Sequence, residues 1–104
     1  MVKRKLVKHA AARRDMVEAT KRLRKHAGED VAYEVVAQLQ AVFARLCRFP
    51  EFGTVWPSQA HKGLRRAVLR DFSHSVFYRP TDTTIEVVRV LHHSRDIPPL
   101  LEDL

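Results

Sequence analysis

Three apolar segments near the end of the chain are separated by gaps too short to hold a helix. The segments are Gly63–Phe72, Ser75–Arg79 and Ile85–Asp96. Ser73 and His74 separate the first pair, and the turn-forming stretch Pro80–Thr83 separates the second. A parallel connection needs a crossover of about a dozen residues, so we expect these segments to form an antiparallel meander of three strands.

Two amphipathic patterns precede these segments. From Ala10 to about His26, apolar residues recur at helical spacing, and basic residues cover the other side. Gly28 ends this pattern, since glycine adopts a positive φ at a helix end without a steric penalty. A second helix with a wide apolar stripe is expected to begin near Glu29 and to end before Pro50. The short link makes the two helices an antiparallel hairpin.

The order of the elements predicts an α+β fold. Weak alternation of charged and apolar residues over about residues 3 to 9 indicates a short first strand in the same sheet. The expected order is strand, helix, helix and three strands (β-α-α-β-β-β), with the helical hairpin packed on an antiparallel β-sheet. Residues 49–63 are expected to form a packed, irregular connection, and we predict one domain over residues 1–104.

The chain is strongly basic, which restricts its partners. Its 104 residues include 19 Lys and Arg against 12 Asp and Glu, a formal net charge of +7. Such a charge favours acidic partners, either a nucleic acid or an acidic protein. The single cysteine excludes an internal disulfide, and no apolar run approaches the roughly 20 residues that span a bilayer. The basic N-terminus lacks the features of a signal peptide. We therefore expect a cytoplasmic protein that does not associate with membranes.

The sequence gives little support for a metal site or a cofactor. His61, His74 and the pair His92–His93 lie on different expected elements, and Cys47 is isolated from them. No pair has the spacing of a structural zinc site. We expect no metal and no cofactor.

Several of these residues together resemble a known family. They are Pro50–Gly53 after the second helix, Gly63–Arg66, Val76–Arg79 and Arg89–Asp96. In this combination nearly the whole chain resembles the RelE/ParE superfamily of bacterial toxins, and the ParE branch in particular. The resemblance implies a toxin of a type II toxin–antitoxin module. It also implies a cognate antitoxin, ParD-like or similar, through which the toxin contacts operator DNA indirectly. We expect the C-terminal half of this antitoxin to be acidic.

The superfamily includes two activities. ParE-like members inhibit DNA gyrase, and RelE-like members are ribosome-dependent mRNA endoribonucleases, which need a base, cations and an acid. When Phe77–Tyr78 is aligned with its family counterpart, Arg66 takes one basic position of the nucleases. Val68 and Ser75 fall at the next two, and Pro98–Pro99 falls at the C-terminal tyrosine position. We therefore expect gyrase inhibition without bond chemistry, with RNA cleavage or an inactive antitoxin-binding regulatory module as the alternatives.

Arginines and histidines of the expected strands are the candidate site residues. The catalytic candidates of a ribonuclease are Arg66, Arg89, His92 and His93. The candidates for contact with the target or the antitoxin are Arg65, Arg66, Arg70, Arg79, Arg89 and Arg95. Alternation along a strand places Arg66 and Arg70 on one face and Arg65 on the other, and it lets only one of the two adjacent histidines face a site. With Arg89, the first two are expected to form a stripe that meets phosphates or carboxylates, the alternative being a solvated sheet face.

Other residues have structural interpretations. Trp56 is expected to anchor the connecting loop on the core rather than to stack on a base. Cys47 is expected to be a small core residue near the end of the second helix. Arg95 and Asp96 are expected to form a local ion pair or cap at the end of the last strand.

Overall fold

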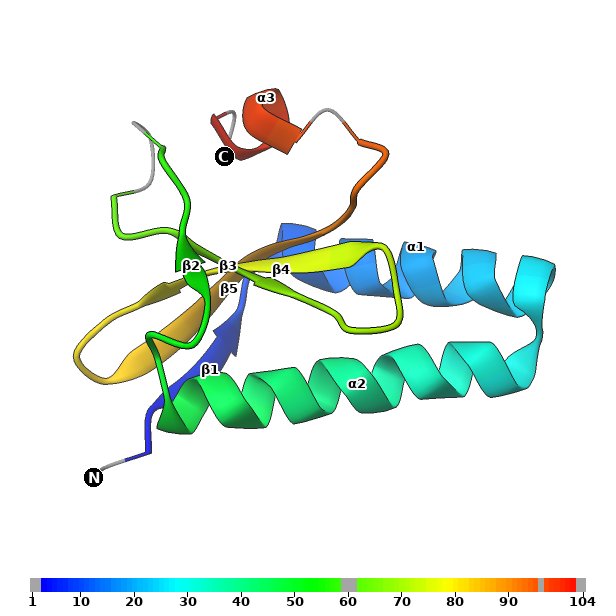
Figure 1. The fold of residues 1–104 in the computed structure, drawn as a ribbon, viewed down its shortest axis with the longest axis horizontal. Coiled ribbons are helices and arrows are strands. Elements are labelled where there is room, and N and C mark those ends of the chain that lie inside the picture. Colours follow the sequence, from blue (N-terminus) through cyan, green and yellow to red (C-terminus); the bar gives the residue numbers. More distant parts are fainter. Residues whose placement is uncertain (1–2, 59–61, 96, 103–104) are drawn as a thin grey trace.

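The computed structural model describes residues 3–58, 62–95 and 97–102. In chain order the elements are β1 (Lys5–Lys8), α1 (Ala10–Ala27), α2 (Glu29–Arg48), β2 (Thr54–Val55), β3 (Arg65–Val68), β4 (His74–Pro80), β5 (Thr84–His92) and α3 (Ile97–Glu102). Helices α1 and α2 lie on one side of the sheet, and α3 lies on the other (Figure 1). The α+β order expected from the sequence is confirmed, with β2 and α3 as additional elements.

The five strands are arranged in the order β1-β5-β4-β3-β2. Strands β3, β4 and β5 form the expected antiparallel meander, and β2 pairs antiparallel with β3. Strand β1 instead runs parallel to β5, with Leu6 beside Ile85, so the sheet is mixed rather than wholly antiparallel. These two strands are far apart in the sequence, so no tight turn dictates their relative direction.

Two expected strands are shorter than predicted. Strand β3 ends at Val68 rather than Phe72, and β5 ends at His92 rather than Asp96, which lies outside the described residues. The turn after β3 is closed by the Leu69 N–H, which donates to the His74 carbonyl at 3.0 Å. Strand alternation therefore does not extend to the residues of this turn.

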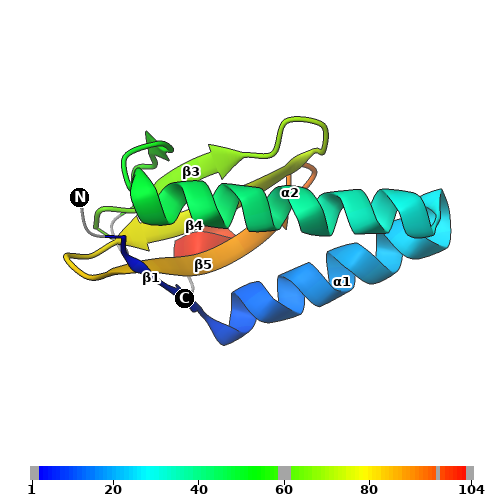
Figure 2. The ribbon, with the colours of Figure 1, turned by 90° about the horizontal axis from the view of Figure 1, so that it is seen from below.

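The helical hairpin forms as expected. Gly28, with φ of 97°, ends α1, and its N–H donates to the carbonyls of Leu23 and Arg24 at 3.1 and 3.3 Å. Glu29 begins α2, which carries basic residues in its last turn, an arrangement that suits the helix dipole. Both helices run across the same face of the sheet (Figure 2). None of the described helices is long and apolar enough to cross a membrane.

Each face of the sheet has its own apolar core. On the helix face, side chains of α1, α2 and the strands pack together, including Leu46, Val76 and Tyr78. Cys47, 4% exposed, lies in this core as predicted. The core of the opposite face is formed by Leu64, Phe77, Val88, Leu91, Ile97 and Leu101.

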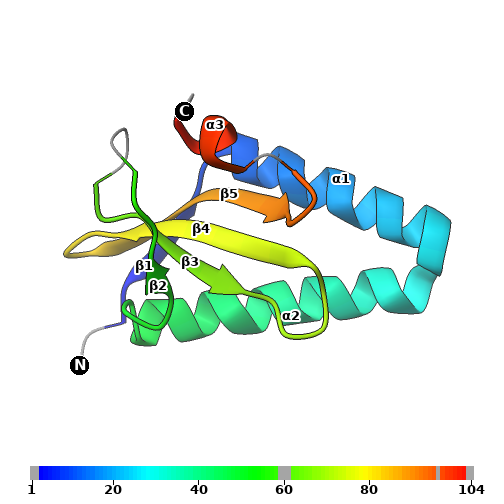
Figure 3. The ribbon, with the colours of Figure 1, turned by 45° about the horizontal axis from the view of Figure 1, so that its top comes forward.

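Helix α3 covers part of this second core (Figure 3). Trp56 packs against the same core, with its ring edge-on to Phe77 at a centroid distance of 5.2 Å. Its predicted role as an anchor is confirmed. We call the sheet face opposite α1 and α2 the open face, because α3 is much shorter than either of them.

Candidate functional site on the open face

Arg66 lies on the open face of the sheet. It pairs across β3 and β4 with Phe77, whose side chain belongs to the core of that face. Its Nε donates to the Ser75 hydroxyl at 2.8 Å, and its guanidinium lies 5.5 Å from the Trp56 ring centroid. Ser75 Oγ is also 2.8 Å from His93 Nε2. We call Trp56, Arg66, Ser75 and His93 the Arg66 cluster.

The exposed groups of this cluster are a cation and a neutral imidazole. Burial, the Arg66 charge and His92 lower the pKa of His93, so its ring is uncharged near neutral pH. Ser75 is fully buried, so its hydroxyl orients its two neighbours and does not meet a partner molecule. The half-buried Arg66 side chain remains available to a phosphate or carboxylate.

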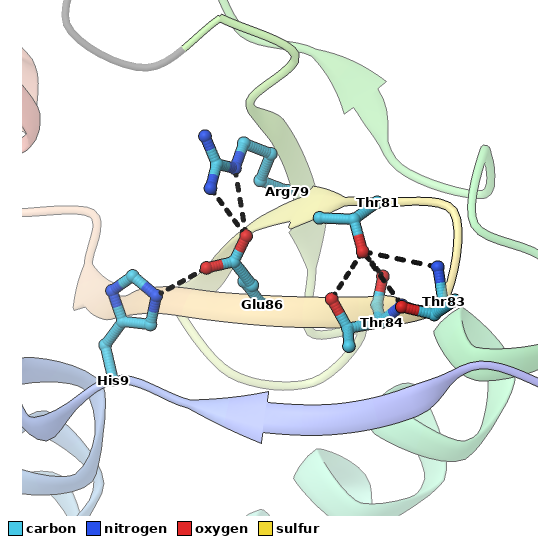
Figure 4. A network of polar contacts seen from close by, with 6 residues as sticks. All are labelled: His9, Arg79, Thr81, Thr83, Thr84 and Glu86. Atoms are coloured by element: carbon cyan, nitrogen blue, oxygen red, sulfur yellow. Dashed lines mark hydrogen bonds and ion pairs between the residues drawn. The ribbon is translucent and has the colours of Figure 1, made fainter.

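Arg79 is held by an acidic neighbour on β5. Its Nε and Nη2 donate to Glu86 Oε2 at 3.1 and 2.6 Å, and His9 Nε2 contacts the other carboxylate oxygen at 3.2 Å (Figure 4). Hydrogen bonding by Arg79, more than by His9, lowers the pKa of Glu86. Much of the Arg79 charge is therefore balanced within the chain.

The turn between β4 and β5 is fixed beside this network (Figure 4). The Thr81 hydroxyl accepts from the Thr84 N–H at 2.9 Å, and the Thr81 N–H donates to the Thr84 carbonyl at 2.8 Å. Arg4 Nε donates to the Thr81 carbonyl at 2.7 Å, which ties the start of the chain to the turn.

Arg65 points away from Arg66, as alternation predicts. It pairs across the strands with Tyr78 of the helix-face core, and its Nη1 donates to the Gly53 carbonyl at 2.7 Å. The Tyr78 hydroxyl accepts from the Gly53 N–H and donates to the Pro50 carbonyl, both at 2.8 Å. Burial raises the pKa of Tyr78. Arg65 thus holds the loop after α2 rather than joining the Arg66 cluster.

Arg89 does not join Arg66 in a stripe. The β4–β5 register shifts at Phe77 and Tyr78, so β5 has an extra residue there and its alternation changes. Arg89 reaches α1, where its Nε and Nη2 donate to the two carboxylate oxygens of Asp15 at 2.7 and 2.8 Å. The pair is largely buried, with side chains 14% and 8% exposed, and its hydrogen bonds raise the pKa of Arg89.

The expected stripe fails at Arg70 as well. This residue is exposed in the turn after β3, beyond the strand whose alternation placed it with Arg66. Arg95 is also exposed, and its expected partner Asp96 lies outside the described residues. Of the ribonuclease candidates, the structure brings only Arg66 and His93 together.

His92 lies on the opposite side of β5 from the Arg66 cluster. Its ring is edge-on to His74 at 4.9 Å, in a cleft of about 440 Å³ between α1 and the strand ends that Arg22 and Arg95 also line. The two adjacent histidines therefore face opposite sides, as predicted. Burial, with nearby positive charge, lowers the pKa of His74 to about 4. Sequence reasoning missed this buried histidine and the bridging role of Ser75, because neither belongs to an apolar or charged pattern.

No metal centre accompanies these residues. Within residues 3–58, 62–95 and 97–102, no three His, Cys, Asp or Glu side chains are grouped so that they could hold a metal ion. His61, one of the histidines considered in the sequence, lies outside these ranges.

Comparison with known proteins identifies the family. The family model described as the ParE toxin of the type II toxin-antitoxin system, parDE, matches residues 6–97. The chain belongs to this family and is the toxin of a type II toxin–antitoxin system. No curated protein matches its sequence significantly.

Solved structures share the fold at low sequence identity. A chain of the chromosomal ParDE system of P. aeruginosa aligns with a TM-score of 0.73 at 18% identity, covering 88% of this chain and 98% of that one. A chain of the E. coli DinJ-YafQ complex gives 0.64 at 18% identity, with 92% and 99% covered. A chain of the RelBE2 complex of Mycobacterium tuberculosis gives 0.62 at 24% identity, with 91% and 97% covered.

Proposed function

We propose that this toxin inhibits DNA gyrase by protein contact in the cytoplasm and performs no bond chemistry of its own. The observation that carries the proposal is the composition of the open face. Its Arg66 cluster presents one cation, whereas exposed Val68 and buried Ser75 stand where further cations of a nuclease are expected. A guanidinium with one fixed hydrogen bond suits recognition of a carboxylate on a protein target.

Membership of the ParE family supports the same target. The resemblance to ParE-like toxins implies gyrase as the target, and the family model matches residues 6–97. Arg89, another ribonuclease candidate, is bound instead to Asp15 of α1. Among the described residues of the Arg66 cluster, Arg66 is the one cation, and a single cation stabilises the developing charge of phosphoryl transfer poorly.

The antitoxin is proposed to present an acidic, partly apolar segment to the helical hairpin. A groove of about 370 Å³ between α1 and α2 is lined by apolar side chains, among them Met16 and Phe43. Its rim carries Lys8, Lys21 and Arg24, and none of the described residues that line it is acidic. We expect binding to weaken as salt rises, because screening reduces the attraction between these cations and the partner's carboxylates.

A gyrase supercoiling and DNA-cleavage assay, with and without the antitoxin, tests the proposed target. The toxin is expected to trap cleaved DNA, the antitoxin to reverse this effect, and Arg66→Ala to abolish trapping. Arg14→Ala removes an exposed arginine from the outer side of α1 and serves as the matched control. A toxin that arrests growth but leaves gyrase unaffected refutes the proposal.

RNA cleavage is the second candidate, and one observation favours it. Ser75 holds His93 beside Arg66, and the lowered pKa of His93 leaves an imidazole able to accept the proton of a ribose 2′-hydroxyl. The 2′-oxygen would then attack phosphorus to form a 2′,3′-cyclic phosphate, with Arg66 stabilising the charge. The P–O5′ bond would break, and the 5′-oxygen would leave as a hydroxyl after taking a proton from solvent water.

Primer extension on messenger RNA from arrested ribosomes distinguishes the two candidates. If cleavage occurs and His93→Ala abolishes it while antitoxin binding is retained, the ribonuclease is correct and the gyrase proposal is wrong. If expression does not inhibit growth and neither target is affected, the chain is an inactive antitoxin-binding module.

A further inference from the structure

The loop after α2 exposes two aromatic rings although buried hydrogen bonds hold it in place. Phe49 is 57% exposed and Phe52 is 47% exposed. The Tyr78 hydroxyl donates to the carbonyl of Pro50, which lies between the two rings in the sequence, and accepts from the N–H of Gly53, which follows them; both distances are 2.8 Å. The exposure of the rings therefore does not come from loose packing of the loop.

The close approach at Gly53 fixes how the loop passes over the sheet. A Cβ at this position would lie 2.7 Å from both the Arg66 carbonyl oxygen and the Tyr78 hydroxyl, so a side chain does not fit. Arg65, the neighbour of Arg66 on β3, donates from its Nη1 to the Gly53 carbonyl. The loop is thus anchored at its end, and Phe49 and Phe52 project from an anchored backbone.

Arginines surround these rings. The Arg45 guanidinium lies 5.0 Å from the Phe52 ring centroid. A cleft of about 340 Å³ is lined by Arg4, Arg48, Phe49, Pro50, Glu51 and Phe52. Among these lining residues one is acidic, and none is leucine, isoleucine, valine or methionine. We call Arg4, Arg45, Arg48, Phe49 and Phe52 the Phe49–Phe52 patch.

We propose that the Phe49–Phe52 patch binds single-stranded nucleic acid. Aromatic rings accept stacked bases without regard to sequence, and adjacent arginines bind the phosphates of the backbone. The three cations of the patch exceed its neighbouring acid, Glu51, so the charge favours a polyanion. The described lining residues include no leucine, isoleucine, valine or methionine that would pack against the apolar anchors of an amphipathic protein segment. The patch is formed by other residues than the Arg66 cluster, so this proposal does not rest on gyrase inhibition.

Fluorescence anisotropy with an oligothymidylate of about 12 nucleotides tests the proposal on the full chain. The double variant F49L/F52L keeps apolar side chains but removes both rings, and we expect it to weaken binding by about tenfold or more. Tyr33→Leu removes another exposed aromatic ring, on α2 outside the patch, and is expected to leave binding unchanged. Arg48→Gln is expected to lower the slope of log affinity against log salt by about one.

An abasic oligonucleotide of the same length provides the decisive control, because it keeps the phosphates and lacks the bases. We expect the wild type to bind the abasic probe more weakly than oligothymidylate. We expect F49L/F52L to bind the two probes equally. Equal binding of the two probes to the wild type overturns the proposal, as does full binding by F49L/F52L. Stronger binding of a polyglutamate peptide overturns it in favour of an acidic protein. Circular dichroism of F49L/F52L confirms that the variant is folded.

Discussion

The two faces of the sheet use the same residue type in different ways. On the helix face, Arg89 is largely buried and both of its bonding nitrogens are bound to Asp15. On the open face, the Arg66 Nε donates to the Ser75 hydroxyl. The other guanidinium nitrogens of this half-buried side chain remain available to a partner molecule. Arg89 is therefore bound by a helix carboxylate, whereas Arg66 has no such partner among the described contacts and is the arginine that we propose for contact with the target.

The largest expected effect breaks the pair on the helix face. Asp15→Ala leaves Arg89 buried without its counter-charge and leaves the Val90 N–H, which donates to Asp15 at 3.0 Å, without an acceptor. We expect the free energy of unfolding to fall by about 3–5 kcal/mol, measured by urea denaturation. The control is Arg79→Ala, which breaks a pair whose arginine side chain is 41% exposed and should cost less than about 1 kcal/mol. Equal losses in the two variants would remove the distinction between the faces.

A pH titration sharpens the contrast on the helix face. The pKa of His74 is about 4 in the folded protein and 6.5 as the ordinary value, so the unfolded chain binds more protons between these limits. Stability contributed by neutral His74 is complete above about pH 6.5 and is lost as the pH falls toward 4. One pKa unit corresponds to about 1.4 kcal/mol, so the loss amounts to about 3 kcal/mol.

His74→Phe is the variant that isolates this effect. It keeps an aromatic ring but cannot be protonated, so its urea midpoint should decline less between pH 6.5 and 4 than that of the wild type. Carboxylates such as Glu86 titrate in both proteins, and the difference between the two curves removes their contribution. Parallel curves would show that His74 is not protonated on unfolding in this range.

Tyr78→Phe has a smaller expected effect. It removes the hydroxyl that donates to the Pro50 carbonyl and accepts from the Gly53 N–H, so both backbone groups lose this hydrogen-bond partner. We expect a loss of about 1–3 kcal/mol in urea denaturation, with the packing of the ring retained. The variant also tests whether the anchored loop matters for Phe49 and Phe52, since its oligothymidylate affinity should fall with no patch residue changed. Unchanged stability would mean that water replaces the hydroxyl at no cost.

The sequence predicted the elements better than it predicted their contacts. Apolar periodicity placed both helices, and Gly28 marked their boundary, because these signals are local. The parallel pairing of β1 with β5 has no local signal, since it joins segments separated by the whole hairpin. The register shift in β5 is likewise invisible in the sequence, and so is the contact of Arg89 with Asp15 of α1.

Within the candidate site, alternation was a sufficient guide inside regular strands and for His93, the first residue past β5. It placed Arg65 and Arg66, and His92 and His93, on opposite faces, as the structure shows. It failed for Arg70, because β3 ends at Val68. The contact between Ser75 and His93 joins β4 to a residue just past β5, so it needed the three-dimensional arrangement.

The smallest expected effect on stability belongs to the open face. Arg66→Ala removes a half-buried side chain, and His93→Ala removes an exposed one. In each variant Ser75 keeps one of its two hydrogen-bond partners. Each should change the free energy of unfolding by no more than about 0.5–1 kcal/mol. Growth inhibition should nevertheless be lost with Arg66→Ala, so stability and toxicity respond to different faces of the sheet. A loss of stability comparable to that of Asp15→Ala would make Arg66 a structural residue like Arg89, and the loss of toxicity would then follow from unfolding rather than from a missing contact.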